Sequence, residues 1–213
     1  MKIPETKKVV VFDLDGTLID SMEDFADVAS NVMPRFYPVS RETARQMYLD
    51  TSGKPFHHQL ETLFPGHPSN ADAAKAFEKE KKNNYLDKQL FQGAREMISH
   101  LRSKNIKVVV SSNNFQALVD QILDVRGIEC DLVLGYQPNF EKGEPHFCKI
   151  TETLQAERSE ITFVGDSLHD AERAQAAGID FIGKEGTFSS SDFQRRFPRV
   201  QVISDLTELT SLF

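Results

Sequence analysis

The sequence has few cysteines, fewer basic than acidic residues, and no long apolar run. Its two cysteines, Cys130 and Cys148, have neither the spacing of a metal site nor that of a disulfide framework, so we expect buried thiols in a cytosolic protein. Lys and Arg total 25 against 32 Asp and Glu, a formal charge of -7, which argues against nucleic-acid binding and anionic membrane surfaces. No run approaches a membrane span, and the apolar stretch beside Lys7 and Lys8 is too short for a signal peptide. These shortages predict a cytoplasmic protein that binds neither nucleic acid nor membrane.

The rest of the composition is that of a globular protein. Of the 213 residues, 39% are hydrophobic and 27% are charged, and we find no internal repeat. This length suffices for one large domain, or for a core with a smaller insert.

The most informative stretch begins with four apolar residues, Val9 to Phe12, that lead directly into Asp13 and Asp15. An apolar run without alternation is typical of a strand covered on both faces, as in a parallel sheet. Residues two apart share one side of a strand, and ligand sites of open α/β sheets lie at the carboxyl ends of the strands. Two carboxylates about 4 Å apart repel by about 4 kcal/mol at an effective dielectric near 20, so a cation is expected nearby. A simple turn with a helix cap is the alternative for this stretch taken alone.

The pattern after this strand predicts a helical insert. From Asp20 to about Lys88 we find helical periodicity and no strand. Helices are expected at about 22–33, from a Ser40 cap to near 51–53, at 56–64 and at 70–85. From Leu90 the α/β alternation returns. Strands are predicted at 106–110, 131–134, 161–164, 180–182 and 200–203, and helices at 94–104, 115–125, 145–154, 169–177 and from a Ser204 cap to Leu212. We therefore expect a parallel sheet of five or six strands flanked by helices, formed by 1–19 and 88–213, with residues 20–87 as an inserted helical domain.

Polar residues follow the later strands as well. Ser111-Ser112-Asn113-Asn114 follows one strand, Gly165-Asp166-Ser167 follows another with Asp170 one turn further, and Lys142 precedes a helix. Taken singly, these are a helix cap, a turn and a surface lysine. Together they place hydroxyls, an ammonium group and carboxylates at one edge of the sheet.

In this order the residues resemble the four motifs of the haloacid dehalogenase-like hydrolase superfamily. The motifs are Asp13-x-Asp15-x-Thr17, then Ser111, then Lys142, then Gly165-Asp166-Ser167-x-x-Asp170. The inserted helices resemble the helical cap of its phosphoglycolate phosphatase-like and β-phosphoglucomutase-like branch. That branch usually shows Lys-Pro-x-Pro at the third motif, whereas this sequence reads Lys142-Gly143-Glu144-Pro145.

The resemblance implies a Rossmann-like core with a cap domain, and a mechanism. Asp13 would attack phosphorus and form an aspartyl phosphate, and Asp15 would act as general acid and base. Mg²⁺ would be held by Asp13, the Asp15 carbonyl and Asp166, with Asp170 in or near its second shell. Ser111 and Lys142 would be catalytic residues that also bind the phosphoryl group, and Thr17 and Ser112 would bind it as well.

Within the superfamily, the residues favour a phosphatase. Dehalogenases and phosphonatases lack the second acid, here Asp15, and the sugar-phosphate mutases carry a cap histidine where this sequence has Phe25. A phosphosugar mutase and a non-catalytic phosphate-binding protein remain as alternatives.

The substrate is expected to be a small phosphorylated metabolite selected by the cap loop 51–55. Lys54 in that loop either meets an anionic group of the substrate or is a solvated lysine. His57 and His58 are expected on a helix surface, and His146 and His169 are expected to point outward. We expect a monomer or a homodimer.

Overall fold

The computed structural model describes residues 7–213, which divide into two compact units. The first contains the described residues up to Asp20 together with Gln89–Phe213, and the second is Ser21–Lys88. Within the described range, no helix combines the length and apolar character needed to cross a membrane.

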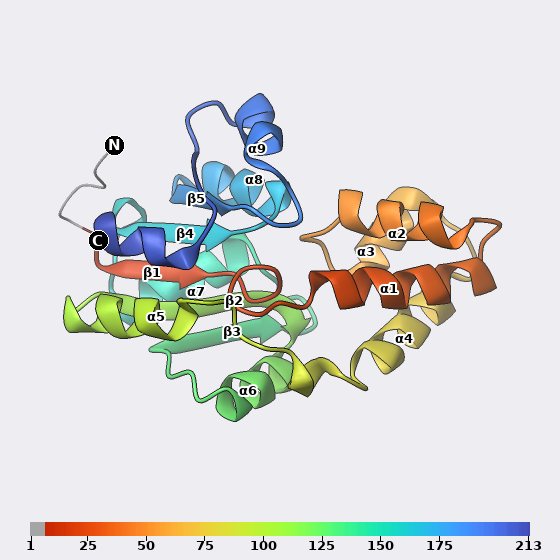
Figure 1. The fold of residues 1–213 in the computed structure, drawn as a ribbon, viewed down its shortest axis with the longest axis horizontal. Helices are drawn as coiled ribbons and strands as arrows, with labels where there is room; N and C mark the ends of the chain where they lie inside the picture. Colours follow the sequence, from red (N-terminus) through yellow and green to blue (C-terminus); the bar gives the residue numbers. More distant parts are fainter. Residues whose placement is uncertain (1–6) are drawn as a thin grey trace. The chain divides into compact units, whose positions relative to one another are not determined.

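The first unit is built on a parallel sheet of six strands in the order β3-β2-β1-β4-β5-β6 (Figure 1). The strands are β1 (Val9–Phe12), β2 (Lys107–Phe115), β3 (Leu132–Tyr136), β4 (Ile161–Gly165), β5 (Asp180–Lys184) and β6 (Gln201–Ile203). Val9 pairs with Lys107 on one side and Ile161 on the other, so β1 lies at the centre. The predicted parallel sheet is therefore confirmed, and its central strand ends directly before Asp13.

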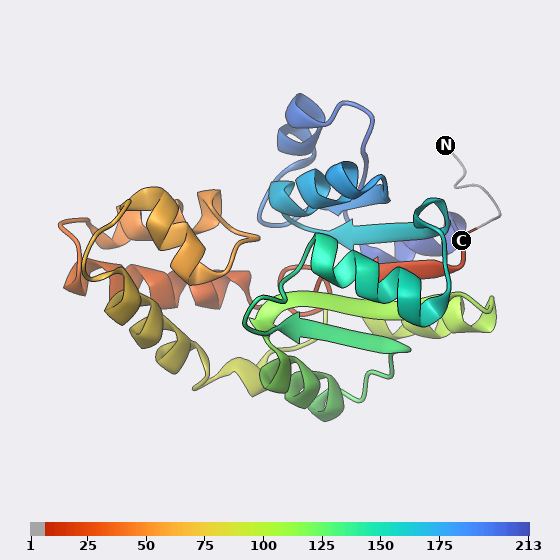
Figure 2. The ribbon, with the colours of Figure 1, turned by 180° about the vertical axis from the view of Figure 1, so that it is seen from behind.

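Helices cover both faces of this sheet. Figure 1 shows α5 (Ala94–Ser103) in front of it, and Figure 2 shows α7 (Glu144–Leu154) on the opposite face. Apolar residues of α7 and of α8 (Leu168–Ala177) form one core cluster with side chains of β1 and β4, including Val11, Phe147 and Phe163. The unbroken burial of β1 explains its apolar run, because both faces are covered.

The second unit is helical throughout and has an aromatic core. It consists of α1 (Met22–Val32), η1 (Met33–Arg35), α2 (Arg41–Asp50), α3 (Phe56–Leu63), α4 (Asn70–Lys81) and η2 (Tyr85–Asp87). The rings of Phe56 and Phe77 stack with centroids 4.0 Å apart, and Phe25 stacks on Tyr85 at 5.6 Å. The helix expected over 70–85 ends at Lys81, and Tyr85 belongs to a separate short 3-10 turn.

Several boundaries differ from the sequence-based expectation. Strand β2, expected to end at residue 110, continues through the polar residues to Phe115. Helix α6 (Gln116–Val125) therefore starts one residue later than expected. Helix α9 (Ser190–Arg196) was not predicted, since it buries only Phe193, although a capping box of Ser189 and Asp192 marks its start. The last helix is the 3-10 helix η4 (Leu206–Ser211), capped by Asp205 instead of Ser204. Cys130 and Cys148 are free thiols, but they are half-buried and not fully buried as expected.

Candidate active site

Asp13 directly follows the central strand and is buried, with 4% of its surface exposed. Its backbone N–H donates to Val164 O at 2.9 Å, which ties the carboxyl end of β1 to β4. Gly16, at φ 85°, allows the chain to turn sharply after the two acids. The turn brings Thr17 back, so that its hydroxyl donates to Asp13 Oδ2 at 3.3 Å.

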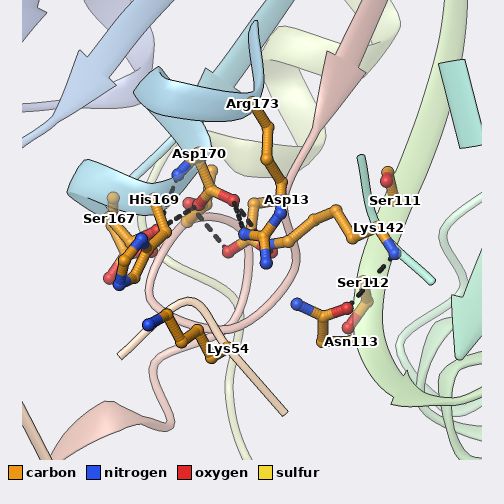
Figure 3. Close-up of polar contacts among 12 residues, drawn as sticks. Asp13, Lys54, Ser111, Ser112, Asn113, Lys142, Ser167, His169, Asp170 and Arg173 are labelled. Carbon is orange, nitrogen blue, oxygen red and sulfur yellow. Dashed lines mark hydrogen bonds and ion pairs between the residues drawn. The ribbon is translucent and has the colours of Figure 1, made fainter. Parts of the chain in front are cut away.

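Lys142 reaches Asp13 from the loop before α7. Its Nζ lies 2.7 Å from Asp13 Oδ1 and 2.7 Å from Asp170 Oδ1, and all three side chains are buried (Figure 3). Its backbone N–H donates to Asn113 Oδ1 at 3.2 Å, which fixes the loop to the end of β2. Gly143 follows at φ 130°, a conformation that proline cannot adopt. Glycine in place of proline after Lys142 therefore permits this turn, and the ammonium group still meets Asp13.

The remaining acids come from the end of β4 and the first turn of α8. Ser167 caps α8 by accepting from the Asp170 N–H, and its hydroxyl donates to Asp170 Oδ2 at 2.7 Å. Asp13, Asp166 and Asp170 each offer an oxygen atom, and these atoms lie within 4.8 Å of one another. The structure therefore brings together three acids predicted from distant parts of the sequence.

Burial and mutual repulsion perturb these groups. Burial raises the pKa of Asp13 well above its usual range, against the effect of Lys142, and burial with the Asp170 charge raises the pKa of Asp166 to about 6. For Lys142, burial lowers the pKa, but the charges of Asp13 and Asp170 prevail and the pKa is raised. The buried acids thus outnumber Lys142. Hard carboxylate oxygens in this arrangement fit a divalent cation such as Mg²⁺, which would relieve the excess negative charge.

Ser111 lies at the expected strand end, but its hydroxyl is turned to the sheet face covered by α7. It forms a buried hydrogen bond of 2.9 Å with Nδ1 of His146, a residue of α7. Ser112 projects differently, and its Oγ accepts from the Asn114 N–H at 3.0 Å. The alternation of side chains along β2 explains why the two serines cannot share one role.

Two histidines near the motifs differ from each other. His146 is buried against the Phe140 ring, so the expectation that it points outward is wrong. Burial, followed by the charge of Lys142, lowers the pKa of His146 to about 3, so it is neutral at neutral pH. His169 is half-buried and pairs with Glu172.

Four further residues contact the predicted ones. Asn114 donates from Nδ2 to Asp15 Oδ2, Asn113 accepts from Lys142, Arg173 NH1 lies 3.5 Å from Asp170 Oδ1, and the Thr187 hydroxyl donates to Asp166 Oδ2. The i,i+3 spacing from Asp170 is a sequence signal for Arg173. Thr187 has no such signal, because its position depends on the loop after β5.

The predicted substrate-selecting residues belong to the second unit. Lys54 precedes α3, and its backbone carbonyl accepts from Gln59 Nε2 at 3.0 Å. Gln59 Oε1 also accepts from the Thr51 hydroxyl at 2.9 Å, so one buried side chain organises this loop. His57 is half-buried and His58 is exposed at the start of α3.

Comparisons with known proteins agree with the resemblance to the haloacid dehalogenase-like hydrolases. The chain is 27% identical to a phosphoglycolate phosphatase from Nitrosospira multiformis over 84% of this chain and 83% of the relative. It is also 27% identical to pyrophosphatase PpaX from Listeria monocytogenes, over 95% of this chain and 94% of the relative. Its fold is similar to that of a predicted phosphatase from Clostridium acetobutylicum, with a TM-score of 0.84 and 20% identity, covering 97% and 98% of the two chains. The model of the haloacid dehalogenase-like hydrolase family matches residues 10–184, and the chain belongs to this family.

Proposed function

We propose that the protein is a Mg²⁺-dependent phosphatase that hydrolyses a small phosphomonoester through an aspartyl phosphate on Asp13. The observation that carries the proposal is the position of Asp13: buried at the end of the central strand, 2.7 Å from Lys142 and clustered with Asp166 and Asp170. The names of the two relatives, a phosphoglycolate phosphatase and a pyrophosphatase, support phosphoryl chemistry.

In the first step, a carboxylate oxygen of Asp13 forms a bond to phosphorus as the bond from phosphorus to the leaving oxygen breaks. Asp13 must be ionised for this attack, and Lys142 favours its charged form against the effect of burial. Asp15 then donates a proton to the leaving oxygen. Asn114 orients Asp15 by donating a hydrogen bond to its Oδ2.

In the second step, Asp15 takes a proton from water, and the water oxygen attacks the phosphorus of the aspartyl phosphate. Inorganic phosphate leaves and the Asp13 carboxylate is restored. Splitting one difficult displacement into two steps is the advantage of the covalent route.

Asp13, the Asp15 backbone carbonyl and Asp166 would hold the metal. A bound Mg²⁺ would supply positive charge to the phosphoryl oxygens and to the acids. Asp170 lies near them, but its Oδ1 is paired with Lys142 and Arg173 and its Oδ2 with Ser167. We therefore assign Asp170 chiefly to anchoring Lys142.

Ser112, Thr17 and Lys142 would bind the phosphoryl group. We assign this role to Ser112 in place of Ser111, because the Ser111 hydroxyl is occupied by His146. Preorganised donors aimed at a phosphoryl group stabilise the charge that develops on its oxygens.

The helical unit Ser21–Lys88 would act as the cap domain that selects the substrate, with Lys54 meeting an anionic group of a phosphorylated metabolite. Phe25 is buried in the aromatic core of this unit, which favours a phosphatase over a phosphosugar mutase.

Two assays distinguish the phosphatase from the alternative functions. Release of p-nitrophenol from p-nitrophenyl phosphate, with Mg²⁺ and with EDTA, distinguishes the phosphatase from a non-catalytic protein. Conversion of hexose 1-phosphate to hexose 6-phosphate without free phosphate would establish the mutase instead.

The substrate class is tested on a panel of phosphorylated metabolites, from phosphoglycolate through sugar phosphates to nucleotides. Lys54→Ala is expected to raise KM for substrates with a second anionic group and to spare p-nitrophenyl phosphate. Lys75→Ala, on the exposed side of α4, is the matched control. Equal kinetics of the Lys54 variant and the wild type on every substrate would remove Lys54 from the site.

A further inference from the structure

The loop between β5 and α9 brings the hydroxyl group of Thr187 into a hydrogen bond with Asp166, one of the acids of the site. Thr187 Oγ1 donates to Asp166 Oδ2 at 2.5 Å, and the two residues are 21 positions apart in the sequence. Asp166 is buried, with 2% of its surface exposed, whereas Thr187 is half-buried. The hydrogen bond engages Oδ2 of a carboxylate that also offers one oxygen within 4.8 Å of oxygen atoms of Asp13 and Asp170.

This loop is held in place on both sides of Thr187. The Glu185 N–H donates to Ile203 O of β6 at 2.8 Å, and the Glu185 carboxylate accepts from the Ser190 N–H and the Ser204 hydroxyl, each at 2.8 Å. Lys184 is buried, with Nζ 3.7 Å from the centroid of the Phe91 ring. A hydroxyl on a loop anchored in this way can restrict a carboxylate to one orientation.

We propose that Thr187 is a positioning residue for the divalent cation, which holds the Asp166 carboxylate so that one oxygen faces the cluster formed with Asp13 and Asp170. This inference rests on the proposed function for the identity of the cation and for Asp166 as its ligand. Partners that orient metal ligands typically change metal affinity by about 10- to 100-fold when they are removed. The role is separate from catalysis, because Thr187 acts only through Asp166.

The test measures Mg²⁺ binding without substrate, by isothermal titration calorimetry with MgCl₂ and by the increase in Tm that MgCl₂ produces. Thr187→Val retains the branched shape and removes the donor, and it is expected to weaken Mg²⁺ binding by about 10-fold or more. Thr187→Ser retains the hydroxyl and is expected to bind within a few-fold of the wild type. Thr187→Ala removes the same donor but does not put a methyl group in place of the hydroxyl. It must weaken Mg²⁺ binding as much as Thr187→Val does. Thr210→Val, on η4, is the control and should bind Mg²⁺ like the wild type.

Kinetics give a second readout. The Mg²⁺ concentration for half-maximal activity should rise in Thr187→Val, while kcat at saturating Mg²⁺ changes much less. Mg²⁺ binding by Thr187→Val and Thr187→Ala equal to that of the wild type would overturn the proposal. A wild-type protein that binds no Mg²⁺ would instead overturn the proposed function on which this role depends.

Discussion

Lys142 Nζ lies 2.7 Å from Asp13 Oδ1 and at the same distance from Asp170 Oδ1, so one buried ammonium group bridges the acid that follows β1 and an acid of α8. A lysine shared in this way is held in place by one carboxylate while it stabilises the charge of the other. Removing one partner of a buried ion pair leaves an uncompensated charge, which is costly. The bridge therefore governs both the ionisation of Asp13 and the placement of a positive charge beside it.

Lys142→Met removes this charge and retains most of the side-chain length. We expect kcat/KM to fall by about 10³ or more, since the lost group stabilises developing negative charge. Because Lys142 lowers the pKa of Asp13, its loss raises that pKa, and the acidic limb of the pH–rate profile should move to higher pH. The measurement is kcat/KM against pH, with the exposed Lys149→Met on α7 as control. An unshifted acidic limb would separate Lys142 from Asp13 ionisation.

The raised pKa of Asp166 predicts how the stability of the metal-free protein depends on pH. Its pKa is about 6 in the folded protein against an ordinary value of 3.8, so between these values the folded state binds more protons than the unfolded state. Stability in EDTA should therefore fall as pH rises from about 4 to 6. Asp166→Asn removes this effect and should be more stable than the wild type above pH 6, by on the order of 1–3 kcal/mol.

Urea unfolding of both proteins in EDTA at pH 4.5 and pH 7 measures the difference. Asp124→Asn, an exposed acid on α6, should not show it. A wild-type protein that gains stability over this interval relative to Asp166→Asn would have the opposite linkage and contradict the assignment.

The two adjacent serines of β2, Ser111 and Ser112, give a matched pair of variants. Ser112→Ala is expected to lower kcat/KM by about 10- to 100-fold through lost phosphoryl binding. Ser111→Ala should change kcat/KM by only a few-fold and lower the free energy of unfolding by about 1–3 kcal/mol, because it leaves buried His146 without its hydroxyl partner. Steady-state kinetics and urea unfolding of both variants check this. The reverse pattern would return the phosphate-binding role to Ser111.

The sequence predicted the parallel sheet and most of the acidic site because both depend on local patterns. The apolar run of β1 indicates burial on both faces. Asp13 and Asp166 directly follow strands, and Lys142 lies two residues before α7. Strand ends of one parallel sheet meet at one edge, so these residues converge without any knowledge of side-chain contacts.

The remaining features depend on information that a local pattern does not contain. Ser111 and Ser112 are adjacent, and only the register of β2 determines which of them faces α7. His146 lies in a helical segment of mixed polarity, and its burial follows from the packing of Phe140. Thr187 meets Asp166 through a loop whose path is set by Glu185 contacts to β6 and α9.

The most direct test of the central claim is phosphate release by Asp13→Asn. The substitution keeps the size of the side chain and removes the attacking carboxylate, so turnover of p-nitrophenyl phosphate in Mg²⁺ should fall by at least about 10³ while the far-UV circular dichroism and cooperative unfolding are retained. Asp124→Asn, treated in the same way, should retain wild-type turnover. Unchanged phosphate release from a folded Asp13→Asn protein would contradict the covalent role of Asp13.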